Sequence, residues 1–101
     1  MPTTTSKILF RGAAATSSTT LYTVPAATTA VVTNIVICNP TGSAVTASMT
    51  INAIDFLGSV SIAANSTAFF DIKQTIPATQ VIAGSASSTS VDFHISGVEV
   101  V

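Results

Sequence analysis

The sequence predicts an all-β domain, an antiparallel β-sandwich of about eight short strands. Thr, Val and Ile dominate the chain, and their branched Cβ atoms favour extended backbone. No window repeats apolar residues at the helical spacing, and turn-forming residues separate the short apolar segments. We expect a jelly-roll-like arrangement of the strands, with an immunoglobulin-like sandwich as the alternative.

The chain has 101 residues, which is the size of one domain. Residues 1–6 supply nothing to a core, so we expect an extended N-terminal arm there. A single sandwich domain is expected over residues 7–101. Its predicted strands cover residues 7–11, 21–24, 30–39, 45–54, 59–62, 68–72, 81–85 and 91–100.

The first two segments each leave one large side chain off the predicted core face. In the first segment Ile8 and Phe10 share a face, which we place on the core, so that Leu9 lies on the other side. The second segment ends at Pro25, and the same alternation places Tyr22 off the core.

The third and fourth segments are the clearest strands. Residues 30–39 form the most apolar stretch, and residues 45–54 alternate cleanly between apolar and polar side chains. The stretch between them, residues 39–43, reads Asn-Pro-Thr-Gly-Ser, which is strong turn chemistry. We therefore expect these two strands to form a hairpin.

The later segments are shorter. Gly58 precedes the fifth, and in the sixth Phe70 and Ile72 face the core while Phe69 lies on the opposite face. Residues 73–80 are expected to form a loop.

The last segment raises a question of register. Its first apolar residues alternate onto the core face, and strict alternation would bury Glu99. We predict a β-bulge at Gly97, which would turn Glu99 outward and Val98 and Val100 inward.

The low charge of the chain indicates which partners it has. Charged residues make up 7% of the sequence, against about 25% in an ordinary domain, and none lies between Arg11 and Asp55. The three cationic residues are too few to follow a phosphate backbone, which excludes nucleic-acid binding. A net charge of −1 favours association, so we expect a homo-oligomer whose copies cover much of the surface. The alternative is a monomer hydrated through its Ser and Thr hydroxyls.

Processing and membrane signals are not expected. The start of the chain has no charged leader followed by a long apolar run, so no signal peptide is predicted. The apolar stretch over residues 30–38 is far shorter than the roughly 20 residues of a membrane-spanning helix. The single cysteine, Cys38, excludes an internal disulfide, and we expect it to be a buried structural thiol.

Catalytic chemistry has few candidates. His94 is the one histidine and alternates with Asp92 on the outward face of the last segment, where the two could hold a metal ion or exchange protons. A hydrated polar pair is the simpler interpretation. The sequence has no Gly-x-Ser-x-Gly elbow and no phosphate-binding loop. We predict no enzyme, no catalytic or metal-binding residue, no cofactor and no small-molecule substrate.

Two groups of residues are candidate partner contacts. Leu9, Tyr22 and Phe69 lie off the predicted core face and are possible interface anchors, unless the register differs or their strands are buried on both faces. The predicted arm contributes an uncharged run of strong β character, suited to strand addition to a partner sheet. That run comprises Thr3, Thr4, Thr5 and Ser6.

Three segments carry a resemblance. Residues 21–39, 62–67 and 91–100, about a third of the chain, resemble small virion structural proteins of tailed bacteriophages. The resemblance implies a sandwich present in many copies, such as a capsid decoration (cement) protein. Such proteins often form trimers that bind and stabilise the shell of major capsid protein. The expected location is then the capsid surface of a virion, after synthesis in the host cytoplasm.

Two alternatives remain beside the decoration protein. Similar strand patterns occur in phage tail and fibre components, which have fewer copies in each particle. A carbohydrate-binding adhesion module is the other alternative. The chain has no Trp and one Tyr, and this argues against the aromatic platforms that sugar sites usually present.

Overall fold

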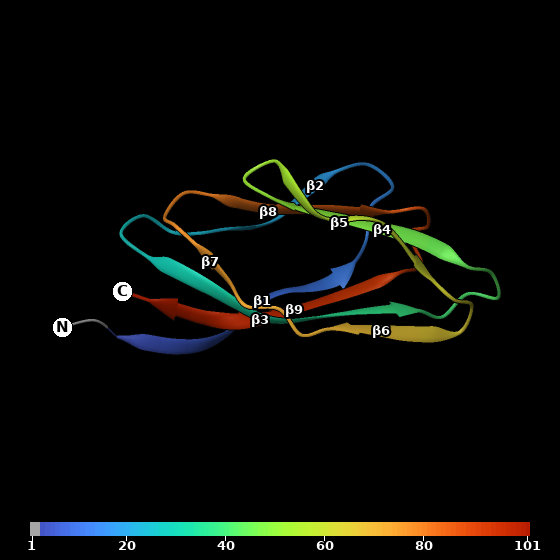
Figure 1. The fold of residues 1–101 in the computed structure, drawn as a ribbon, viewed down its shortest axis with the longest axis horizontal. Coiled ribbons are helices and arrows are strands. Elements are labelled where there is room, and N and C mark those ends of the chain that lie inside the picture. Colours follow the sequence, from blue (N-terminus) through green and yellow to red (C-terminus); the bar gives the residue numbers. More distant parts are fainter. Residues whose placement is uncertain (1–2) are drawn as a thin grey trace.

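Two antiparallel sheets packed face to face make up the computed structural model, which describes residues 3–101 (Figure 1). The all-β prediction is confirmed. The strands are β1 (Thr4–Ala13), β2 (Thr19–Thr23), β3 (Thr29–Asn39), β4 (Val45–Ile51), β5 (Ile54–Ile62), β6 (Ser66–Phe70), β7 (Gln74–Ile76), β8 (Val81–Ala86) and β9 (Asp92–Val100). Residues 3–101 contain no helix that is long and apolar enough to cross a membrane.

The strand order is that of a jelly roll. The five-stranded sheet runs β1-β9-β3-β6, with β7 also pairing with β3, and the four-stranded sheet runs β2-β8-β4-β5. Since β6 and β7 both pair with β3, they act as two pieces of one interrupted edge strand. First and last strands are thus neighbours, as are the second and the second-to-last. The jelly-roll expectation is confirmed over the immunoglobulin-like alternative.

The core lies between the two sheets and follows the alternation of the strands. Its centre is formed by Ile35 and Ile37 of β3, Phe93 and Ile95 of β9, and Met49 of β4, all fully buried. These strands run through the middle of their sheets, so their inward side chains are covered on every side.

The predicted hairpin of residues 30–39 and 45–54 is wrong. β3 belongs to the five-stranded sheet and β4 to the four-stranded one, so the loop between them crosses the sandwich. Asn39 is fully buried and holds this loop: its Nδ2 donates to the carbonyls of Ser43, Ile62 and Ala63, and its Oδ1 accepts from Thr41. Turn residues show where a chain reverses, but they do not show whether the next strand joins the same sheet or the opposite one. The alternation of apolar residues does not distinguish the two cases either, because both cover one apolar face of each strand.

The fourth predicted strand also ends early. Asn52 and Ala53 have φ angles of 53° and 62°, and they form the two-residue turn that joins β4 to β5. Two successive residues with positive φ are the signature of a type I′ hairpin turn. The alternating pattern of residues 45–54 continued through this turn and concealed it.

The bulge predicted at Gly97 is wrong in its position. β9 runs without interruption, and the extra residues are Leu9 in β1 and Thr33 in β3, both close to Ser96 and Gly97. A Cβ atom at Gly97 would clash with the carbonyl oxygen of Val31, so glycine permits this close approach. Because β9 keeps strict alternation, Glu99 points inward.

The bulge in β1 exchanges the predicted facing of Ile8 and Leu9. Leu9 is buried in the core, while Ile8 is 49% exposed on the outer face. Phe10 is partly buried against the core. The prediction of Leu9 off the core is therefore wrong, because one extra residue changes which side chains face inward.

The predicted arm is part of the sheet over the residues that the structure describes. Thr4, Thr5 and Ser6 belong to β1 and pair with the C-terminal end of β9. Thr3 precedes them and exchanges backbone hydrogen bonds with Val101. Their strong β propensity is satisfied within the chain itself. Met1 and Pro2 lie outside the described residues.

Candidate partner-binding surface

The outer face of the five-stranded sheet carries apolar side chains at the surface. Phe69 of β6 is 76% exposed and Ile8 of β1 is 49% exposed. Between them the half-buried outward residues of β3 and β9 include Val31, Val36 and Val98. A sheet face that is covered only by water usually carries mostly polar side chains. This outer face exposes more apolar surface than that.

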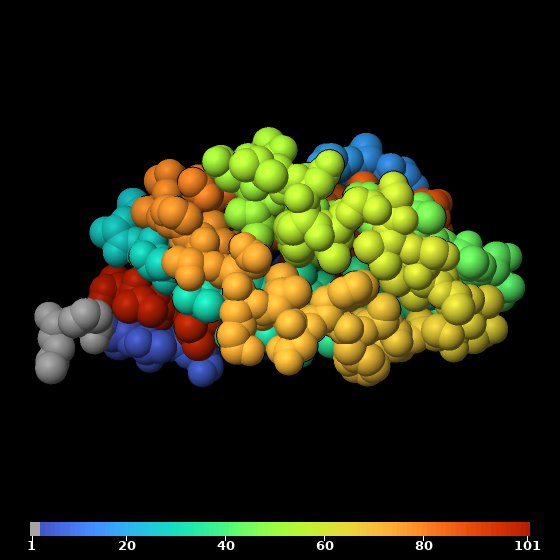
Figure 2. All heavy atoms as spheres, viewed as in Figure 1, coloured from blue at the N-terminus to red at the C-terminus, as the bar shows by residue number. Residues whose placement is uncertain are grey.

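One cross-strand row crosses this face. Arg11 of β1 lies opposite His94 of β9, His94 lies opposite Val36 of β3, and Val36 lies opposite Phe69 of β6. The row thus begins with a cation at one edge and ends with an exposed aromatic ring at the other. The space-filling view shows β6 along the lower front of the molecule and β1 at the lower left (Figure 2).

The outer face of the four-stranded sheet is different in chemistry. Its outward side chains are mostly hydroxyl-bearing and include Thr20, Thr23, Thr46, Ser48, Thr50, Ser61 and Ser85. Hydroxyl groups of this kind are readily hydrated. The two outer faces of the sandwich therefore differ in chemistry, because one carries mostly hydroxyl groups and the other exposes larger apolar side chains.

The predicted contact residues divide between surface and core. Phe69 is exposed as predicted. Thr3, Thr4, Thr5 and Ser6 are exposed at the edge of the five-stranded sheet. Leu9 and Tyr22 are buried, with 6% and 9% of their surface exposed. The two buried residues cannot serve as surface anchors in this fold. Both belong to strands whose register differs from the predicted one, which was the alternative considered for them.

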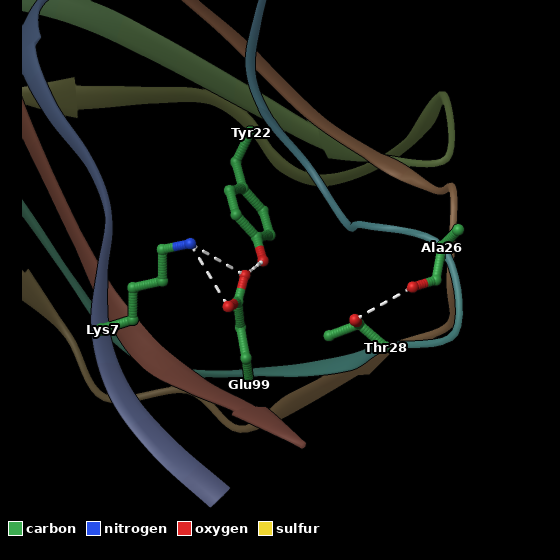
Figure 3. Close-up of polar contacts among 5 residues, drawn as sticks. All are labelled: Lys7, Tyr22, Ala26, Thr28 and Glu99. Atoms are coloured by element: carbon green, nitrogen blue, oxygen red, sulfur yellow. Dashed lines mark hydrogen bonds and ion pairs between the residues drawn. The ribbon is translucent and has the colours of Figure 1, made fainter. Parts of the chain in front are cut away.

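Tyr22 takes part in a polar cluster between the sheets. Its hydroxyl donates a hydrogen bond to the Glu99 carboxylate, and Lys7 Nζ donates to both Glu99 oxygens at 3.2 Å (Figure 3). The cluster joins β1 and β9 of one sheet to β2 of the other. Its one signal in the sequence is the alternation of β9, which brings Glu99 inward when no bulge is assumed.

The cluster shifts the pKa values of Glu99 and Tyr22. The hydrogen bond from Tyr22 lowers the pKa of Glu99, burial opposes this shift, and Lys7 adds to it. Burial, followed by the hydrogen bond to Glu99 and its charge, raises the pKa of Tyr22. The negative charge on Glu99 is therefore stabilised in the fold.

The acidic and histidine residues do not gather. Asp92 and His94 both lie half-buried on the outer face of β9. No group of three His, Cys, Asp or Glu side chains that could hold a metal ion occurs within residues 3–101. Cys38 is half-buried rather than buried, because it lies on the outer face of β3, so the prediction of a buried thiol is wrong.

A shallow groove lies at the end of the four-stranded sheet. It has a volume of about 460 Å³, and its lining combines the polar residues Ser18, Thr50, Asn52, Thr79 and Gln80 with the apolar residues Ala53, Val81 and Ala83. Asn52 and Thr79 have positive φ angles of 53° and 70°. The groove lining is uncharged, and its hydroxyl and amide groups can donate and accept hydrogen bonds.

Neither a protein-family model nor a curated protein matches this chain.

Proposed function

We propose that this chain is a non-catalytic structural protein of a phage virion, a capsid decoration (cement) protein that binds the shell of major capsid protein. The observation that carries the proposal is the difference between the two outer faces of the sandwich. One exposes Phe69 and Ile8 beside the half-buried Val31, Val36 and Val98, and the outward side chains of the other are mostly hydroxyl groups. Decoration of a shell requires one surface that binds and one that stays hydrated.

Two further properties support the proposal. Charged residues make up 7% of the chain, which suits a surface covered by neighbours in an assembly. The jelly roll is also an architecture of viral capsid proteins, although a fold alone does not determine a function. The resemblance to phage virion proteins implies a trimer over threefold positions of the capsid.

The proposal is tested on particles of the virus that encodes the chain. We expect quantitative mass spectrometry to find hundreds of copies in each particle. We expect electron micrographs of particles labelled with antibodies against the chain to show the label on the capsid surface. A few copies to some tens would instead identify a tail or fibre component. Absence of the chain from purified particles would overturn both assignments.

A surface variant locates the contact on the sandwich. The purified variant is added to capsid shells that were prepared without this chain, and the amount bound is measured. We expect Phe69→Asp to bind at least tenfold less than the wild type, because it places a charge on the apolar outer face. Ser61→Asp is the matched control, since Ser61 is exposed on the hydroxyl-bearing face of β5. Equal binding of the two variants would contradict the assignment of the binding face.

One observation favours a carbohydrate-binding function as a second candidate. The uncharged groove bordered by Asn52, Thr79 and Gln80 offers amide and hydroxyl groups to a neutral, hydroxylated ligand. Binding to a glycan panel that Gln80→Ala abolishes would support this candidate. A panel without any bound glycan would remove it.

A further inference from the structure

Within residues 3–101, the first half of β1 leaves a regular row of backbone groups without a hydrogen-bond partner. Thr3 and Val101 exchange both of their backbone hydrogen bonds, at 2.8 and 2.9 Å. Because doubly bonded and unbonded pairs alternate in an antiparallel ladder, Thr5 also bonds to β9, whereas Ser6 directs its N–H and C=O away from β9. The same holds for Thr4 and Ile8. These three residues form what we call the β1 edge.

The other sheet edges carry features that discourage strand addition. The register of β2 shifts between Thr20 and Tyr22, and β5 is irregular where Ser59 has a φ of 51°. β6 and β7 are short pieces of five and three residues. Bulges and short strands are devices by which proteins protect an edge. The β1 edge contains no proline and pairs with β9 without a register shift from Thr4 to Ile8, and the bulge of this strand, at Leu9, follows it.

The charge that could protect the β1 edge is turned away from it. Lys7 points inward and forms its ion pair with Glu99 at 3.2 Å. An inward-facing lysine guards an edge by resisting burial, but here its charge is neutralised within the same chain. The side chains left on the edge are uncharged and belong to Thr, Ser and Ile.

We infer that two copies of this chain join through the β1 edge, antiparallel, with Ser6 of each copy on the twofold axis. In this register Ser6 pairs with its counterpart, and Thr4 of each copy pairs with Ile8 of the other. Each of the three edge residues in each copy donates one backbone hydrogen bond and accepts one, which gives six bonds. Every outward backbone group of the edge is then satisfied.

The side chains agree with this register. Thr4, Ser6 and Ile8 all lie on the outer face, so a twofold axis perpendicular to the sheet keeps them on the same side. Ile8, which is 49% exposed in one copy, then packs beside Thr4 of the other, a favourable β-branched pair. Lys7 lies opposite Thr5 rather than opposite a second lysine.

The pairing would join the two five-stranded sheets into one continuous sheet. Both apolar outer faces would point in the same direction, so the dimer would present twice the binding face of one copy. The inference concerns contacts between copies of this chain and does not rest on the proposed function. It predicts an even number of copies, whereas the resemblance to decoration proteins implies three.

Opposite charges at Ser6 test the pairing directly. We expect Ser6→Lys and Ser6→Glu each to be monomeric by light scattering, because each places like charges together on the axis. A mixture of the two variants should form a one-to-one heterodimer. Ser61→Lys, at an exposed position of β5, is the control and should keep the wild-type mass.

Proline variants give a second test, which separates a loss of association from a loss of folding. The N–H of Ser6 bonds to nothing in its own sheet, so Ser6→Pro should fold as the wild type does by circular dichroism and weaken association at least tenfold. Thr5→Pro removes a bond to β9 and should lower stability instead. A wild-type monomer, or an oligomer of any size that Ser6→Pro and Ser6→Lys leave unchanged, would overturn the pairing; a trimer of that kind would leave the proposed function standing.

Discussion

Tyr22 of β2 donates its hydroxyl hydrogen bond to the carboxylate of Glu99 in β9, and this bond connects the two sheets of the sandwich. Lys7 from the edge strand completes the cluster from the other side of the carboxylate. Two strands from the start of the chain, β1 and β2, and the last strand, β9, are thus held at one ionised group. The stability of the fold should therefore depend on the charge of Glu99.

The first prediction concerns acid. Since the pKa of Glu99 is lower in the fold than in the unfolded chain, its contribution is complete above the ordinary glutamate pKa of about 4.3 and is lost as the pH falls below it. At pH 7 we expect Glu99→Gln to lower the free energy of unfolding by about 1–2 kcal/mol. The difference from the wild type should shrink between pH 5 and about pH 3 in urea titrations.

Alkali gives the complementary test. Because the pKa of Tyr22 is raised in the fold, its contribution is present below the ordinary tyrosine pKa of about 10 and is lost as the pH rises above it. Tyr22→Phe should remove this part of the alkaline loss. Asp55→Asn, at an exposed position on β5, is the control for both titrations.

A constant difference between Glu99→Gln and the wild type from pH 7 to 3 would show that the charge is unimportant.

The second prediction concerns the loop that crosses between the sheets. We expect Asn39→Ala to lower the free energy of unfolding by about 2–4 kcal/mol, because three carbonyls and the Thr41 amide lose their buried partner. Asn34→Ala is the matched control, since Asn34 is exposed on the same strand. Chemical denaturation measures both, and equal effects would show that the Asn39 bonds do not hold the loop.

The third prediction concerns Gly97. An added Cβ would clash with the Val31 carbonyl and lie 3.0 Å from Leu9 Cδ1, so Gly97→Ala should destabilise the fold by about 1–3 kcal/mol. Gly42→Ala is the control, because a Cβ there would meet nothing within 4 Å. Thermal unfolding compares the two variants. If Gly97→Ala is as stable as Gly42→Ala, the bulges do not require this close approach.

The fourth prediction concerns the turn between β4 and β5. Ala53 has a φ of 62°, where an alanine is strained and a glycine is not. Ala53→Gly should therefore stabilise the fold by up to about 1 kcal/mol, by forming the preferred Asn-Gly turn. Ala64→Gly, in a turn residue without positive φ, should destabilise it slightly. A loss of stability in Ala53→Gly would contradict the turn geometry.

The fold class followed from the sequence because composition and alternation act locally. Phe93 and Ile95 of β9, and Val45 and Met49 of β4, alternate onto the core face as predicted. The choice of sheet did not follow, since the loop after Asn39 suits a hairpin as well as a crossing between sheets. Only the buried Asn39 side chain, which bonds to residues beyond β4, distinguishes the two, and those contacts are not local.

The candidate surface was predicted in part for the same reason. Phe69 was placed correctly, because β6 is regular. Leu9 was misplaced, because the bulge in β1 depends on β9 and Gly97, which lie at the other end of the chain. The residues of the predicted arm were recognised as strand-forming, but their pairing with β9 depends on register that no local pattern specifies.

The native mass of the wild-type chain, measured by light scattering at two protein concentrations and two salt concentrations, shows whether copies of the chain associate. We expect an assembly of at least two chains that persists at high salt, because uncharged contacts hold it together. A single species of 10.2 kDa under every condition would contradict the claim that other copies cover this surface.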